Sequence, residues 1–147
     1  VLADKWGRGD CRGSLDVMWK MIKLVAALAV PMAVFLSLVS TYIMRGYGAS
    51  FVAGYGTLIL SVHTAALVAI MAPVGQFIAA SGRMWIGFWL NFGWGTAMLL
   101  ASWWMVRWGA EGLAGARLAA YVCHAAWTFG FVFVAMRQSR TENRSIG

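Results

Sequence analysis

Four long apolar blocks limit what this sequence can fold into. They cover about residues 21–44, 51–80, 84–106 and 113–136, and short turns rich in glycine, serine and arginine separate them. At about 1.5 Å per residue, about 20 helical residues cross a hydrocarbon core about 30 Å thick. Backbone amides in hydrocarbon must be hydrogen-bonded within their own segment, which a helix achieves. The blocks therefore predict an all-α integral membrane protein with four transmembrane helices.

The composition supports lipid as the solvent. Of the 147 residues, 61% are hydrophobic and 12% are charged, whereas an average soluble domain is about 25% charged. The net charge of +7 does not indicate nucleic-acid binding, because the basic residues stand singly at the ends of the apolar blocks and form no continuous patch. We expect the lipid bilayer, and no nucleic acid, to be a partner.

Polar segments flank the four blocks. Residues 1–20 form a leader broken by glycine, and residues 137–147 form a polar tail. The leader lacks the apolar core of a signal peptide and the chain starts at Val1, so we expect it to continue a longer protein. Within the blocks, Pro31 predicts a kink in the first helix, and Pro73 predicts a bend in the last two turns of the second.

Basic residues are distributed unequally between the two predicted sides of the membrane. The leader, the turn between the second and third blocks, and the tail carry nine, and the opposite side carries three. Positive charge concentrates in cytoplasmic loops, so we expect a multi-pass protein of the cytoplasmic (inner) membrane with both ends of this chain in the cytoplasm. The nine are Lys5, Arg8, Arg12, Lys20, Lys23, Arg83, Arg137, Arg140 and Arg144, and the three are Arg45, Arg107 and Arg117.

Small residues and tryptophans predict how the helices pack. Small side chains four residues apart let helix backbones approach in a bilayer. Tryptophans near helix ends are typical of the headgroup level, while Trp94 lies deeper and is expected to pack against other helices. The small pairs are Gly115 with Ala119 and Ala116 with Ala120, a further stripe is Gly87, Asn91 and Gly95, and the terminal tryptophans are Trp85, Trp89, Trp103, Trp104 and Trp108.

Motifs of catalysis are missing from the sequence. It contains no phosphate-binding loop, no nucleophile elbow and no zinc-protease motif. All five acids lie in the leader, the predicted loops or the tail, so no block carries a carboxylate at the membrane midplane. Two histidines are too few to predict a metal site. We expect a protein that is not an enzyme and that uses no cofactor.

Polar side chains within the blocks are the candidates for a substrate cavity: His63, Gln76, Asn91 and His124. His63 and His124 lie at a similar depth, close to the middle of the bilayer, so they could meet. Intramembrane polar groups often face a bundle interior or a watery path, which favours a cavity for a headgroup. The alternative, which is the commoner case, is hydrogen bonding that only holds the helices together.

Charged residues at the outer ends of the blocks form a second set of candidates. Arg45, Arg117 and Glu111 lie at the predicted outer rim, where an arginine could steer an anionic substrate. Long basic side chains at helix ends also extend to the interface simply to keep their charge in water. We expect this second role to be the commoner one for the rim arginines.

Several motifs together resemble the C-terminal part of polysaccharide flippases. These flippases are the O-antigen and lipid-linked oligosaccharide translocases of the multidrug/oligosaccharidyl-lipid/polysaccharide exporter superfamily. The resemblance covers nearly the whole chain. The segments that carry it are GRGDCRGSLDVMWK before a helix with a central proline, YGASF at Tyr47 to Phe51, VGQFIAASGRMWIGFWLNFGW at Val74 to Trp94, and WGAEGLAGARLAAY at Trp108 to Tyr121.

The resemblance implies a larger helical transporter bundle, of which these four helices are the last of about twelve. It implies alternating access, which passes a polyprenyl-pyrophosphate-linked oligosaccharide of lipopolysaccharide biosynthesis from the inner to the outer leaflet. The partners would be this lipid-linked oligosaccharide and the upstream helices of the same parent chain. Family cavities are often cationic, whereas no Lys or Arg lies deep within a block here.

Two alternative functions remain open from the sequence. One is a multidrug antiporter of the same superfamily, although such antiporters commonly use intramembrane acids, which are missing from these blocks. The other is a non-catalytic membrane anchor subunit of an enzyme complex, in which His63 and His124 would be haem ligands. No haem or quinone motif accompanies these histidines.

Overall fold

The described part of the chain is helical throughout. A computed structural model of the protein describes residues 7, 11–82 and 84–142, and these contain helices and turns but no strand. Four helices exceed 20 residues, and short helical segments join them in pairs. The elements are α2 (Cys11–Leu38), α3 (Ser40–Tyr47), the 3₁₀ helix η1 (Ala49–Gly54), α4 (Tyr55–Ala80), α5 (Met84–Met105), the 3₁₀ helix η2 (Val106–Trp108) and α6 (Gly109–Glu142).

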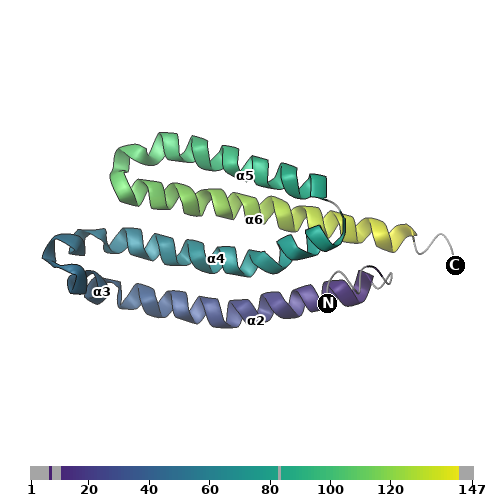
Figure 1. Cartoon of the computed structure of the whole chain (residues 1–147), viewed down its shortest axis with the longest axis horizontal. Coiled ribbons are helices and arrows are strands. Elements are labelled where there is room, and N and C mark those ends of the chain that lie inside the picture. The colour runs from purple at the N-terminus through teal and green to yellow at the C-terminus, as the bar shows by residue number, and fades with distance from the viewer. Residues whose placement is uncertain (1–6, 8–10, 83, 143–147) are drawn as a thin grey trace.

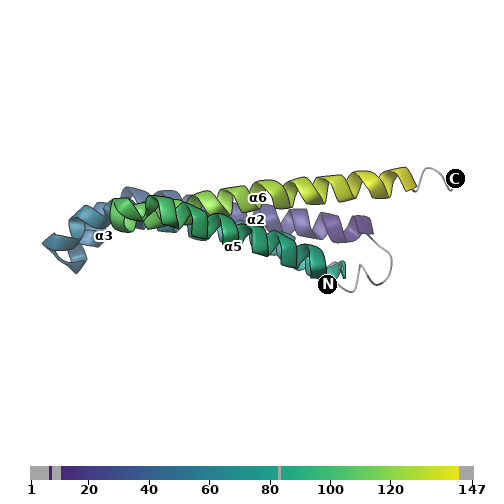
Figure 2. The same cartoon turned by 90° about the horizontal axis from the view of Figure 1, so that it is seen from above.

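The long helices lie side by side in one layer, in the order α2, α4, α6, α5 (Figure 1). Both connections through 3₁₀ helices lie at one end of the layer, while the start of α2, the Ser81–Gly82 turn and the end of α6 lie at the other. Seen from above, α5 and α6 diverge from the η2 turn toward the opposite end (Figure 2). The four-helix prediction puts the start of α2, the Ser81–Gly82 turn and the end of α6 on one side of the membrane and the two 3₁₀ connections on the other. The fold has the same grouping.

Helix boundaries match the apolar blocks closely in the third helix and less closely elsewhere. α5 spans Met84–Met105, against a predicted 84–106. The first and fourth helices extend into the predicted leader and tail, where polar residues continue the backbone hydrogen bonding and no proline interrupts it. Residues 1–6, 8–10 and 143–147 of these two segments, with Lys5, Arg8 and Arg144, lie outside the description, as do Arg83 and the side chains of Arg137 and Arg140.

The two prolines do not interrupt their helices. α2 continues through Pro31, and the helical pattern breaks at Val39, whose φ and ψ are −94° and 3°. The amide of Val39 still donates to the carbonyl of Phe35 at 3.1 Å, so the chain changes direction only locally before α3. α4 likewise continues through Pro73, and its last turns bend toward α6 (Figure 1).

Seven buried apolar side chains form one cluster near the end of the layer where α4 finishes. They come from α2, α4 and α6 and bury apolar surface that would otherwise face solvent. Trp19 of α2 also stacks on Phe129 of α6, with ring centroids 6.2 Å apart. The cluster consists of Met18, Ile22, Met71, Val74, Phe77, Ile78 and Val132.

Large apolar side chains cover much of the outside of the layer. Leu28 and Leu38 of α2 are 69% and 75% exposed, and Trp103 of α5 is 87% exposed. Two stretches, Arg12–Leu38 and Ala49–Ala80, are long and apolar enough to cross a membrane. Only 11% and 22% of their most apolar windows are buried within the fold. These two helices are therefore not enclosed by the protein itself.

Candidate functional site

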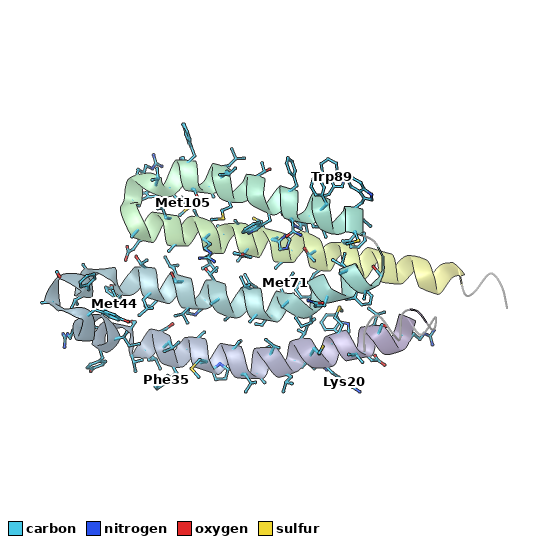
Figure 3. The ribbon with its side chains drawn as sticks, in the orientation of Figure 1. Lys20, Phe35, Met44, Met71, Trp89 and Met105 are labelled. Carbon is cyan, nitrogen blue, oxygen red and sulfur yellow. The ribbon has the colours of Figure 1, made fainter. Side chains whose placement is uncertain are left out.

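A pocket of about 400 Å³ lies where α5 and α6 diverge, beside the last turns of α4. Its size falls within the range of about 300–1,000 Å³ that is typical of small-molecule sites. The wall is mostly apolar, with Asn91, His124 and Thr128 as its hydrogen-bonding side chains. The remaining lining residues are Met71 (labelled in Figure 3), Gly75, Ile78, Ala79, Met84, Gly87, Phe88 and Leu90.

Two of the predicted cavity residues meet at this pocket. Asn91 of α5 donates its side-chain amide to the carbonyl of Gly87, at 2.8 Å, so its Oδ1 is not used in that bond. His124 of α6 accepts a hydrogen bond on Nδ1 from the indole Nε1 of Trp127, at 3.0 Å. Because Nδ1 accepts this bond, the ring proton of His124 lies on Nε2 and the ring is neutral.

The other two predicted cavity residues lie elsewhere on α4. His63 and Gln76 are exposed and do not line the pocket. The Nδ1 of His63 lies 2.9 Å from the carbonyl oxygen of Ile59, one turn earlier in the same helix. His63 therefore does not share the pocket with His124. Within the described part, no group of three or more His, Cys, Asp or Glu residues could hold a metal ion.

Thr128 is the pocket residue that sequence reasoning missed. It is only 3% exposed, and its hydroxyl has no hydrogen-bond partner. Thr64 and Thr96 behave in the usual way for helices, since their hydroxyls donate to carbonyls one turn earlier, at 2.8 and 2.9 Å. The signal available in the sequence was position, because Thr128 lies four residues after His124 and therefore on the same face of α6.

The rim charges are distributed over the end of the layer that carries the 3₁₀ helices. Arg45 of α3 and Arg117 of α6 are both exposed. Glu111, in the first turn of α6, lies against Gly56 of α4, where a larger side chain would displace it. The guanidinium of Arg107, at the same end, lies over the rings of Trp104 and Trp108, at 4.8 and 4.4 Å from their centroids. Such cation–π contacts hold the charge beside an apolar surface.

The predicted packing of small residues between helices is confirmed on α6 and is wrong for part of α5. Ala116 and Ala120 of α6 are buried at 0% and 2% exposure, which confirms close packing at that pair. On α5 the predicted stripe does not pack along its length, because Gly95 has open space where a side chain would be. Gly93, which lies off that stripe, faces the indole of Trp127 instead. Trp94 packs as predicted against Tyr121, with ring centroids 5.0 Å apart.

Replacing Trp127 by phenylalanine should destabilise the fold by about 1 kcal/mol, the usual net value of one hydrogen bond. The variant removes the indole donor from His124, together with the six-membered-ring atoms of the indole that lie nearest Gly93, so about 1 kcal/mol is the least expected loss. The measurement is the thermal unfolding midpoint of the purified protein. Trp103→Phe is the matched control, because Trp103 is 87% exposed, and its midpoint should not change. Equal shifts in both variants would mean that the bond to His124 contributes nothing.

Comparisons with known proteins give no family assignment. No protein-family model matches the chain, and no curated protein and no solved structure matches it. The flippase resemblance therefore stays a prediction that depends on the sequence segments alone.

Proposed function

We propose that this chain is a membrane-embedded helical layer and that all four long helices cross the bilayer. The exposed apolar surface supports this proposal. The core helix of a soluble protein would be mostly buried, whereas the most apolar windows of α2 and α4 are 11% and 22% buried. Monomeric soluble proteins rarely expose apolar patches larger than a few hundred Å². Hydrocarbon around the layer would cover this surface without any further protein.

The hydrogen bonding of polar side chains also fits a lipid solvent. An unpaired polar group in hydrocarbon costs several kcal/mol, so such groups are expected to bond to their own helix or to a neighbour. The side chains of Ser37, His63, Thr64, Asn91 and Thr96 all bond to carbonyls one turn earlier in their own helices. One polar atom of each side chain is thereby paired within its own helix.

The proposed orientation places both ends of the chain in the cytoplasm. The start of α2, the Ser81–Gly82 turn and the end of α6 share one end of the layer (Figure 1). Among the described basic residues, those of the first half of α2 and the last turns of α6 lie toward that end, which favours the cytoplasmic side of an inner membrane. They are Arg12, Lys20, Lys23, Arg137 and Arg140. The α3–η1 connection and η2 would face outward.

We further propose that the layer is one part of a transporter that moves a polyprenyl-pyrophosphate-linked oligosaccharide by alternating access. The observation that carries this proposal is the pocket with Asn91, His124 and Thr128, set in an otherwise apolar layer near the proposed cytoplasmic end. A second helical bundle, supplied by upstream helices of the parent chain, would close over one face of the layer. The sequence resemblance supports the substrate class.

A flipping assay tests the transporter proposal. Membrane vesicles that contain the intact gene product receive a fluorescent polyprenyl-pyrophosphate glycan on the cytoplasmic face, and a glycosidase on the other face reports its arrival. The protein should accelerate arrival, and the double variant Asn91→Leu, His124→Phe should slow it about tenfold. Cys123→Ser, an exposed change on α6, should leave the rate unchanged. Arrival at the rate of protein-free vesicles would contradict the proposal, and uptake of a cationic dye instead would favour a multidrug antiporter.

A further inference from the structure

We propose that the pocket between α4, α5 and α6 binds one uncharged sugar unit of the substrate. The inference rests on the proposed transport function and adds to it a specific subsite and its ligand chemistry. The hydrogen-bonding capacity of the pocket carries it. Its polar side chains are Asn91, His124 and Thr128, and two of these three offer groups that the fold itself leaves unused.

Thr128 gives the strongest indication of a missing partner. Its hydroxyl is buried and unpartnered, although bonding to the preceding turn is available to a helical threonine and is used by Thr64 and Thr96. Buried polar groups without a partner are rare in proteins, and each one requires an explanation. Since Thr128 lines the pocket, a ligand hydroxyl there would supply the missing bond. Thr57, another unpartnered threonine, lies in the first turn of α4 and outside the pocket.

Asn91 adds an acceptor from the facing helix. Its amide nitrogen is engaged with the carbonyl of Gly87, so Oδ1 remains available to accept from a ligand hydroxyl. The His124 ring accepts from Trp127 on Nδ1 and is a neutral part of the wall. None of the described residues that line the pocket carries a formal charge. An anionic or cationic ligand would therefore be buried there without a counter-charge, which is unfavourable.

The apolar wall completes the chemistry expected of a sugar site. Phe88 lines the pocket and belongs to an aromatic group on α5, with ring centroids 5.9, 5.5 and 6.2 Å from those of Trp85, Trp89 and Phe92. A sugar ring presents an apolar face of C–H groups and an edge of hydroxyls, so it matches an aromatic wall combined with a few neutral hydrogen-bonding groups. A pocket of this kind fixes orientation through the polar groups and gains affinity from the apolar surface.

Methyl NMR of the full chain in lipid nanodiscs, with ¹³C-labelled methionine, tests this subsite. Met71 and Met84 line the pocket, while Met44 lies in α3 at the other end of the layer. The probe is octyl β-glucoside below its micelle concentration, with octyl phosphate and octyltrimethylammonium as charged probes of equal chain length. We expect a saturable shift of the Met71 and Met84 methyl signals with the glucoside alone and no change at Met44.

The variant series separates specific binding from partitioning into lipid. Thr128→Val keeps the side-chain volume and removes the hydroxyl, so it should weaken glucoside binding about fivefold, and Asn91→Leu should do the same. Thr96→Val is the matched control and should bind normally, because its hydroxyl bonds within its own helix. Equal shifts with all three probes, absence of any shift, or an unchanged affinity of Thr128→Val would overturn the subsite.

The subsite and the transport function can be contradicted separately. Glucoside binding without glycan flipping would keep the subsite and remove the transporter function. Flipping of the glycan with no binding in the pocket would keep the transporter function and remove the subsite. Water as the sole occupant of the pocket would satisfy Thr128 but would leave the Met71 and Met84 signals unchanged by the glucoside, which counts against the subsite.

Discussion

Replacing Leu28 by arginine should reduce insertion of α2 into a membrane by about 2.5–3.5 kcal/mol, the cost of a charged residue near the centre of a transmembrane helix. Leu28 lies well inside the Arg12–Leu38 stretch and is 69% exposed, so in a bilayer its side chain would face lipid. In a water-soluble protein, the same change at so exposed a site would alter stability by less than about 0.5 kcal/mol. A lipid surrounding and a water surrounding of α2 therefore predict clearly different effects of Leu28→Arg.

The insertion of the full chain can be measured with glycosylation acceptor sites on both sides of α2. Leu28→Phe is the size control and should insert as well as the wild type. Trp103→Arg should cost less than Leu28→Arg, because Trp103 is exposed two residues before the end of α5, where a long basic side chain can extend to water. Normal insertion and stability of Leu28→Arg would show that lipid does not surround α2.

Replacing Gly112 by alanine should destabilise the α5–α6 hairpin by about 3 kcal/mol. This value is the upper end of the usual free-energy cost of overpacking, because the nearest atom here belongs to the backbone. A Cβ atom on Gly112 would collide with the backbone carbonyl oxygen of Met105, and it would lie 3.0 Å from the Cβ of Trp108. The backbone of the η2 turn cannot move aside as a flexible side chain can. The chain would have to open the turn between the two helices.

The unfolding midpoint in a denaturing-detergent titration measures the effect at Gly112. Gly130→Ala on the same helix is the matched control, since a Cβ atom there meets nothing within 4 Å. It should leave the midpoint unchanged or raise it, because alanine favours a helix more than glycine does. A Gly112→Ala midpoint equal to that of the control would contradict the close contact at η2.

The sequence predicts the helices well because their cause is local. Apolar blocks ended by Ser81–Gly82 and by Arg107–Gly109 set the limits of α5 to within one residue at its end. Gly109 has a φ of 65°, a conformation that favours glycine, which explains why the turn lies there. The start of α2 at Cys11 was not predictable from hydropathy, because polar residues can extend a helix beyond its apolar part.

The candidate site was predicted only in part because it depends on which helices are neighbours. Depth along the chain placed His63 and His124 at one level, but it does not determine which way each side chain points. The structure brings His124 together with Asn91 through the α5–α6 hairpin and leaves His63 bonded to its own helix. The position of Thr128, four residues after His124, was the one signal in the sequence, and its unpaired hydroxyl becomes visible only in the fold.

Labelling of single cysteines tests most directly whether the four helices cross a membrane. Ser50→Cys lies in η1 and Ser81→Cys in the turn after α4, at opposite ends of the layer, and both are made with Cys11 and Cys123 replaced by serine. In intact cells, a membrane-impermeant maleimide should label position 50, and it should label position 81 only after the membrane is permeabilised. Labelling of both positions from the same side, or recovery of the protein in the soluble fraction, would contradict the four crossings.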